Sequence, residues 1–185
     1  MALDGEFPEV VAAAKEGAEW ALACLYRDLQ PSLLGYLRAR DAREAEDLAS
    51  ETWVSVARSL PSFVGDESGF RAWVFTIARR RVIDLRRHDA RRPATAPIEG
   101  TEPGPPADAA ETEAIGSVVT AAALAVIATL PPVQAEIVLL RVVAGLSADE
   151  VAKVVGKRAG TVRVLQHRAL RRLAAQLADR DGTER

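Results

Sequence analysis

The spacing of apolar residues along the chain predicts helices rather than strands. In the segment 42–60, apolar positions recur every three or four residues, which is the period of one helix face. The segment 70–89 repeats this pattern, and the segment 16–38 is helix-like, although Pro31 is expected to break it or to open its second part. We expect residues 1–11 to be mobile. The apolar positions of the first stripe are Ala45, Leu48, Ala49, Thr52, Val56 and Leu60.

A pair of short helices is predicted within residues 147–173. Ser147 with Glu150 three residues later is the capping-box signature of a helix start. Gly156 is expected to end that helix, and the next one begins shortly afterwards. Because Gly160 has no side chain, we expect the second helix to pack closely on the first. The pattern is typical of a helix-turn-helix.

A segment rich in Pro, Gly and Thr divides the chain in two. Residues 92–110, RPATAPIEGTEPGPPADAA, are too rich in proline and glycine for a regular element, so a flexible linker is predicted. Beyond it, helices are predicted over 112–129 and 131–144. The expected fold class is all-α, with two small helical domains joined by the linker and a helix-turn-helix in the second domain. The predicted divisions are 1–92, 93–112 and 113–185.

Composition then excludes several classes of protein. The chain has 185 residues, and no apolar stretch in it is long enough to cross a bilayer. Because the first residues, MALDGEFPEV, are acidic and have no apolar core, we expect no signal peptide. We therefore expect a cytoplasmic protein without direct membrane insertion. A single cysteine, Cys24, and two distant histidines provide no disulfide, metal site or catalytic pair. Since there is also no Gly-rich phosphate loop, we expect neither an enzyme nor a cofactor.

The formal net charge of −2 hides two strongly basic segments. One holds seven arginines within residues 79–92, just after several aromatic residues. This combination suits an opened DNA strand, because rings stack on bases while arginines hold the backbone. Phe63 lies in the polar loop before this helix, where its ring either fastens the loop or contacts a ligand.

The other basic segment is the second helix of the helix-turn-helix. Such a helix fits the major groove, where arginines reach phosphates or guanine edges. A solvated helix face is the plain alternative for these arginines. The outward residues are Arg163, Val164, His167, Arg168 and Arg171.

These segments resemble those of a known family. The stretches AREAEDLASETWVSVARSLPSF and GFRAWVFTIARRRVIDLRR are similar to the second conserved region of bacterial sigma factors of the extracytoplasmic-function (ECF) group. The stretch LPPVQAEIVLLRVVAGLSADEVAKVVGKRAGTVRVLQHRALRRL is similar to the fourth region. The resemblance implies a transcription initiation factor that binds core RNA polymerase and directs it to promoter DNA.

The resemblance also implies roles for individual residues. Asp47 and Glu51, two carboxylates one helical turn apart, would dock on the polymerase. Many relatives are held inactive by an anti-sigma factor, so this partner is expected as well. The −10 element would be read by Phe63, Arg79, Arg80, Arg86 and Arg87. The −35 element would be contacted by Arg141, Lys157, Arg158, Arg163, Val164, His167 and Arg168.

Three departures from the family pattern concern the promoter sequence that is read. Arg80 stands where many relatives have Asn, and Val164-Leu165 where they often have Ser-Arg. Ser50 stands where Gln commonly precedes Glu51. A stand-alone helix-turn-helix regulator is the main alternative function, although it leaves Asp47, Glu51 and the first arginine cluster without a role. A helical adaptor that does not contact DNA is a further alternative.

Overall fold

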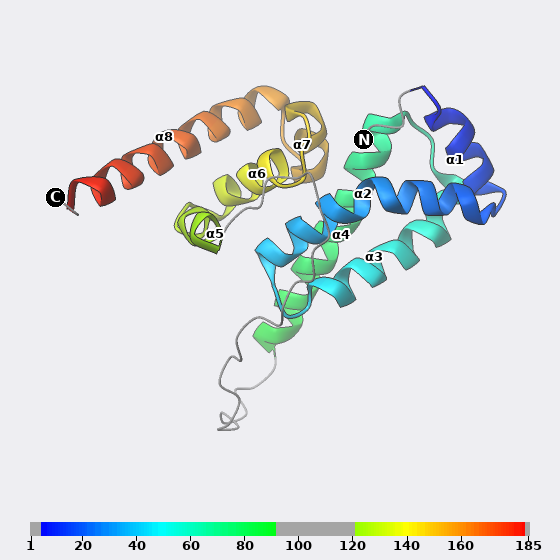
Figure 1. Cartoon of the computed structure of the whole chain (residues 1–185), viewed down its shortest axis with the longest axis horizontal. Helices are drawn as coiled ribbons and strands as arrows, with labels where there is room; N and C mark the ends of the chain where they lie inside the picture. The colour runs from blue at the N-terminus through cyan, green and yellow to red at the C-terminus, as the bar shows by residue number, and fades with distance from the viewer. Residues whose placement is uncertain (1–4, 92–120, 184–185) are drawn as a thin grey trace.

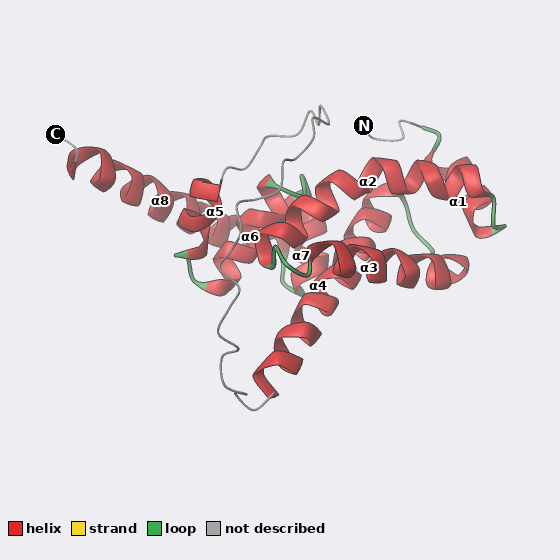
Figure 2. Cartoon of the chain, turned by 60° about the horizontal axis from the view of Figure 1, so that its bottom comes forward, coloured by secondary structure: helices red, strands yellow, loops and turns green. Residues whose placement is uncertain are grey.

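The computed structural model describes residues 5–91 and 121–183, and every regular element in these ranges is helical (Figure 1, Figure 2). The all-α fold class is therefore confirmed. The predicted linker, 93–112, and the first residues of the helix predicted over 112–129 lie outside the described residues. The elements are α1 (Phe7–Lys15), α2 (Glu19–Arg40), α3 (Ala45–Ser59), the short 3-10 helix η1 (Leu60–Ser62), α4 (Glu67–Arg91), α5 (Ala121–Ala128), α6 (Pro132–Val142), α7 (Ala148–Val155) and α8 (Ala159–Thr183).

Helices α1–α4 form the N-terminal bundle. Helix α3 packs against both α2 and α4, and α1 packs against α2. The predicted apolar stripe of α3 is buried at every position from Ala45 to Leu60, which confirms both the helix and its inward face. On α2, the inward residues Leu25, Leu29 and Leu33 recur every four positions and are fully buried.

Helix α2 runs through Pro31 without a break, so the expected interruption is wrong. A proline inside a helix removes one hydrogen bond and crowds the preceding turn, at a cost of about 3 kcal/mol. Leu29 and Leu33 flank Pro31 on the buried face, and burying each leucine contributes about 1.5–3 kcal/mol. The core contacts on both sides of the proline offset its penalty.

The N-terminus also differs from the expectation of mobility. Residues 7–11 begin helix α1, in which Phe7 and Val10 are buried. The Phe7 ring lies 5.7 Å from that of Phe70, centroid to centroid. This helix is held by tertiary packing that its own sequence does not reveal.

The helix-turn-helix is built as predicted. Ser147 Oγ accepts a hydrogen bond from the Glu150 main-chain N–H at 3.2 Å, and the Glu150 carboxylate accepts one in return from the Ser147 N–H. Gly156 ends α7 at φ 65°, in the left-handed region that glycine adopts without strain. The inward residues Val151 and Val162 are fully buried.

Gly160 does not have the expected packing role. It is exposed, and a Cβ atom added there would meet nothing within 4 Å. The contact of α8 with the rest of the domain is made by other residues on its inner face, Val162 and Ala169, both fully buried.

The two halves of the chain lie against each other. Helix α7 packs on α4, and α6 contacts α2, as Figure 1 shows. At one point a side chain comes close to the α2 backbone, since a Cβ atom on Gly35 would lie only 3.1 Å from Val143 Cγ1. Among the described residues, no helix combines the length and the apolar character needed to cross a membrane.

Candidate nucleic-acid and polymerase interfaces

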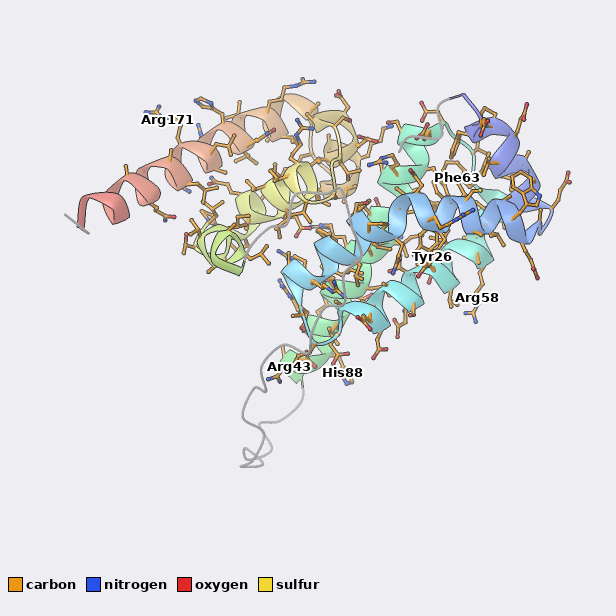
Figure 3. The ribbon with its side chains drawn as sticks, viewed as in Figure 1. Tyr26, Arg43, Arg58, Phe63, His88 and Arg171 are labelled. Atoms are coloured by element: carbon orange, nitrogen blue, oxygen red, sulfur yellow. The ribbon has the colours of Figure 1, made fainter. Side chains whose placement is uncertain are left out.

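Phe63 fastens the loop between η1 and α4. Only 9% of its surface is exposed, and its ring lies 5.4 Å from Phe70, edge to face, and 5.1 Å from Trp73. Its main-chain carbonyl accepts a hydrogen bond from Lys15 Nζ of α1 at 2.5 Å. Of the two roles that the sequence leaves open for this ring, the geometry supports the structural one, although one edge still faces the cavity described next. Figure 3 shows Phe63 beside α1.

An open cavity of about 420 Å³ lies beside this loop. Its lining combines the aromatic rings of Phe63 and Trp73 with the hydroxyl groups of serine and threonine residues. Val64, next to Phe63, is 93% exposed at the edge, so the loop presents a bare apolar side chain to solvent. Val64 was not predicted as a site residue, although an apolar residue in a polar loop is a usable signal. The lining residues are Ser59, Ser62, Phe63, Val64, Gly69, Ala72, Trp73, Thr76 and, from α7, Lys153.

The predicted −10 arginines of α4 do not share one environment. Arg80, Arg86 and Arg87 are exposed. Arg86 donates to the Arg40 carbonyl at 3.2 Å, and Arg87 lies 3.7 Å from Asp84 in an exposed ion pair. Arg79 is half-buried and points to α6 instead. The sequence predicted the charge cluster but not this division.

The acidic positions of α3 are exposed and partly paired. Asp47 and Glu51 both face solvent. Glu51 Oε2 accepts a hydrogen bond from Arg81 Nη1 at 3.1 Å, and Arg81 Nη2 donates to Ser55 Oγ at 2.7 Å. Arg81 thus steadies one carboxylate of the predicted docking face.

Two aromatic residues pack between α2 and α3. The Tyr26 ring of α2 is exposed and lies 5.1 Å from the ring of Trp53, whose indole N–H donates to Gln30 at 2.7 Å. Val54 is also half-exposed. Figure 3 marks Tyr26 in this part of the bundle. An exposed apolar group beside carboxylates is typical of a protein-binding surface.

The predicted −35 residues of the helix-turn-helix separate into an exposed set and one internal residue. Arg163 makes an exposed ion pair with Asp149 at 3.3 Å, which is worth little to stability. Arg141 is half-buried, donating to the Leu146 carbonyl and, at 3.2 Å, to Gln166 Oε1. It therefore ties α6 to the turn and to α8. The exposed set is Lys157, Arg158, Arg163, Val164, His167 and Arg168, and Figure 3 shows Arg171 on the same helix.

A polar cluster that the sequence did not predict lies between the halves. Glu136 of α6 is buried and accepts a hydrogen bond from Tyr36 Oη at 2.5 Å. Its carboxylate also lies 3.0 Å from Arg40 Nη2 and 3.7 Å from Arg79 Nε. Burial raises the pKa of Tyr36 well above its usual value, and the Glu136 carboxylate raises it further, so the phenol remains a donor.

Comparison with known proteins identifies the family. The family model described as Sigma-70 region 2 matches residues 25–92, and the one described as Sigma-70, region 4 matches residues 120–173. The chain is 39% identical to the ECF RNA polymerase sigma factor ShbA of Streptomyces griseus subsp. griseus, over 90% of this chain and 92% of that protein. The chain belongs to the ECF group of RNA polymerase sigma factors.

Other relatives agree. The ECF RNA polymerase sigma factor SigD of Mycobacterium tuberculosis is 36% identical, over 96% of this chain and 87% of its own length. The structure of CnrH in complex with the cytosolic domain of CnrY is similar in fold, with a TM-score of 0.68 over 94% of this chain and 97% of that one, at 20% identity.

This ECF sigma factor therefore directs RNA polymerase to promoters, and it is an initiation factor rather than an enzyme. The stand-alone regulator is not favoured, because the region 2 match falls on helices α2–α4, which a regulator would leave without a role. Region 2 thus contains the cavity and the acidic face, and region 4 contains the helix-turn-helix.

Proposed function

We propose that the cavity beside Phe63 receives an unstacked base of the −10 element. A planar base needs an apolar surface to stack on and hydroxyl groups to contact its edge. Trp73 supplies the surface, and Ser59, Ser62 and Thr76 supply hydroxyls. The exposed arginines Arg80, Arg86 and Arg87 follow along α4, where they would hold the strand's phosphates.

The −35 element is read, in this proposal, by the exposed face of α8. Arg163, His167 and Arg168 recur at spacings that place them along one side of the helix. Val164 lies among them half-exposed and can contact a thymine methyl group but cannot donate a hydrogen bond. Lys157 and Arg158, just before the first residue of α8, would contact the DNA backbone.

Core RNA polymerase docks, in this proposal, on α3 through Asp47 and Glu51. Val54, three residues after Glu51 on α3, is half-exposed and adds apolar area next to that carboxylate, and Tyr26 on α2 is also exposed. A mixed acidic and aromatic surface suits a basic partner with an apolar centre. An anti-sigma factor would compete for the same helices, and the similar CnrH was solved with a protein partner, the cytosolic domain of CnrY.

The proposed organisation is a region 2 domain within 1–92 and a region 4 domain within 113–185, with 93–112 connecting them in the cytoplasm. The observation that carries the residue assignments is that the open cavity is lined by region 2 except for Lys153, whereas the exposed arginine face belongs to region 4.

In vitro transcription with core polymerase and genomic fragments tests this proposal. We expect start sites that appear only when the chain is added, and binding of duplex DNA by the chain alone that is weak and falls steeply with salt. Tight, specific duplex binding without polymerase would instead support a regulator. Substitutions in the cavity should change recognition of the −10 element, and substitutions on the exposed face of α8 should change recognition of the −35 element.

A further inference from the structure

One ion pair joins the first turn of α7 to the exposed side of α8. Asp149 Oδ2 of α7 lies 3.3 Å from Arg163 Nη2 of α8, although the two residues are 14 positions apart in the chain. Figure 1 shows α7 beside the start of α8. Within the part of the chain that the structure describes, Arg163 is the one residue of the predicted −35 set that pairs with a carboxylate. The pair therefore distinguishes Arg163 from the other cations on this face.

The main chain that carries these two side chains is held in place. The capping box at the start of α7 fixes the first turn, which contains Asp149. Val162, the residue before Arg163, is fully buried. Arg141 donates to the main-chain carbonyl just before Ser147 and, at 3.2 Å, to a side-chain oxygen on α8. With both backbones fixed, the relative position of the carboxylate and the guanidinium depends on their side chains alone.

The ion pair affects the direction of the arginine more than the stability of the domain. The Arg163 side chain is 60% exposed and that of Asp149 is 67% exposed, so the pair adds little to stability. A free arginine side chain has many rotamers, and this freedom is lost when the guanidinium binds a base. A carboxylate that already holds one end of the guanidinium reduces that loss. The remaining N–H groups of Arg163 stay available as donors.

We propose that Asp149 is a positioning residue that determines the preference of Arg163 for guanine in the −35 element. Guanine presents two acceptors, N7 and O6, in the major groove, and an arginine that donates to both distinguishes guanine from the other bases. A phosphate also binds arginine but carries no sequence information. Because the Asp149 carboxylate repels phosphates, the arginine that it holds favours the base edge. The inference rests on the −35 assignment proposed above.

A purely structural role for Asp149 makes a different prediction. A carboxylate in the first turn of a helix interacts favourably with the helix dipole, and Asp149 occupies such a position in α7. Loss of that interaction would lower the stability of the helix and leave the choice of base unchanged. Base preference at the −35 element therefore separates the positioning role from the structural one.

Transcription by core polymerase and the full chain, from templates randomised over the −35 element, tests the positioning role. Arg163→Ala first locates the base that Arg163 reads, as the position at which the preference falls. Asp149→Asn should lower the preference for guanine at that position by about threefold, the scale of an exposed ion pair. Positions read by the rest of α8 should keep their preferences. Asp149→Glu keeps a carboxylate and should retain most of the preference for guanine.

The double substitution shows whether Asp149 acts through Arg163. In that case Asp149→Asn should change nothing further at this position once Arg163→Ala is present. An equal effect of Asp149→Asn with and without Arg163 would overturn the proposal. An unchanged −35 profile in Asp149→Asn alone would overturn it as well. A lowered unfolding temperature, with a loss of preference that Asp149→Glu does not restore, would show the structural role instead.

Glu9→Gln is the matched control, because Glu9 is an exposed carboxylate in the first turn of α1, in the other domain. It should leave the −35 profile unchanged. The two proposals fail in different ways. If Arg163→Ala leaves the whole −35 profile unchanged, the proposed reading face is wrong. If Arg163→Ala changes the profile and Asp149→Asn does not, only the positioning role is wrong.

Discussion

The Nζ atom of Lys15 donates a hydrogen bond to the main-chain carbonyl of Phe63 at 2.5 Å, so helix α1 holds the loop that forms one wall of the cavity. The aromatic contact between Phe7 and Phe70 brings α1 to the same place. The N-terminal helix therefore has a positioning role towards the proposed −10 reader.

Lys15→Met should weaken this restraint while keeping most of the aliphatic side chain. Loss of a hydrogen bond costs about 1 kcal/mol, which corresponds to roughly a fivefold decrease in promoter opening if the loop has to be held in place. Permanganate reactivity of thymines in the opened promoter measures the effect. Glu16→Gln, a neighbouring exposed change, should leave opening unaltered, and equal opening by Lys15→Met would refute the positioning role.

Phe63 and Val64 are adjacent, but their substitution should affect different properties, stability for Phe63 and base preference for Val64. Phe63→Ala removes a buried ring that contacts Phe70 and Trp73, and we expect it to destabilise region 2 by about 3–5 kcal/mol. Val64→Ala removes exposed methyl groups and should leave the free energy of unfolding within about 0.5 kcal/mol of the wild type.

Val64→Ala should instead change the preference for bases in the −10 element. Urea denaturation measures the first effect, and transcription from templates randomised at −10 measures the second. A Val64 variant with an unchanged −10 profile would remove that residue from the proposed reader.

Substitutions of Arg141 and Arg168 should also have different effects, although both residues were predicted to contact the −35 element. Arg168→Ala should cost about 1–3 kcal/mol of −35 recognition if the side chain reads a guanine, with little change in stability. Arg141→Ala breaks the hydrogen bonds to Leu146 and Gln166, so thermal unfolding should begin at a lower temperature. A stable Arg141 variant that fails only in DNA binding would show that its internal contacts are secondary.

Local signals in the sequence predicted the parts of the fold that local interactions determine. The stripe of α3 and the capping box of Ser147 and Glu150 depend on spacings of three or four residues, and both are confirmed. The continuity of α2 through Pro31 depends instead on burial of leucines on both sides of it. Burial against distant residues cannot be obtained from helical spacing alone.

The candidate sites show the same limit. Charge clusters on α4 and α8 were visible in the sequence, but the separation of Arg79 from its neighbours depends on Glu136, which lies 57 positions along the chain and belongs to the other domain. A single acidic residue in the apolar run QAEIVLL was a signal that something had to pair with it. Its partners could not be named until the two domains were seen together.

Charge reversal on α3 should weaken polymerase binding. Asp47→Lys with Glu51→Lys replaces two exposed carboxylates, and a basic partner would then be repelled, so we expect at least a tenfold loss of affinity for core polymerase. Fluorescence anisotropy of the labelled chain measures it. Glu9→Lys with Glu16→Lys makes the same change in net charge on α1 and should have a small effect. Equal losses for the two pairs would mean that only net charge matters.

Tyr36 gives the domain interface a dependence on pH. Burial raises its pKa well above 10, Glu136 on α6 raises it further, and Arg40 on α2 and Arg79 on α4 act in the opposite direction. The folded state therefore keeps a proton that the unfolded chain releases near pH 10. The stability that this proton contributes is fully present below about pH 10 and is lost as the pH rises towards the folded-state pKa.

Tyr36→Phe should lower the free energy of unfolding by about 1.5–3 kcal/mol at pH 8, because the Glu136 carboxylate loses its donor. Above pH 10 the wild type should lose stability faster than the variant, so the difference between them narrows. Urea denaturation of both proteins at pH 8 and at about pH 11 measures this difference. The lysines titrate in both proteins and cancel in the comparison. Parallel losses of stability would show that the Tyr36 proton is not linked to folding.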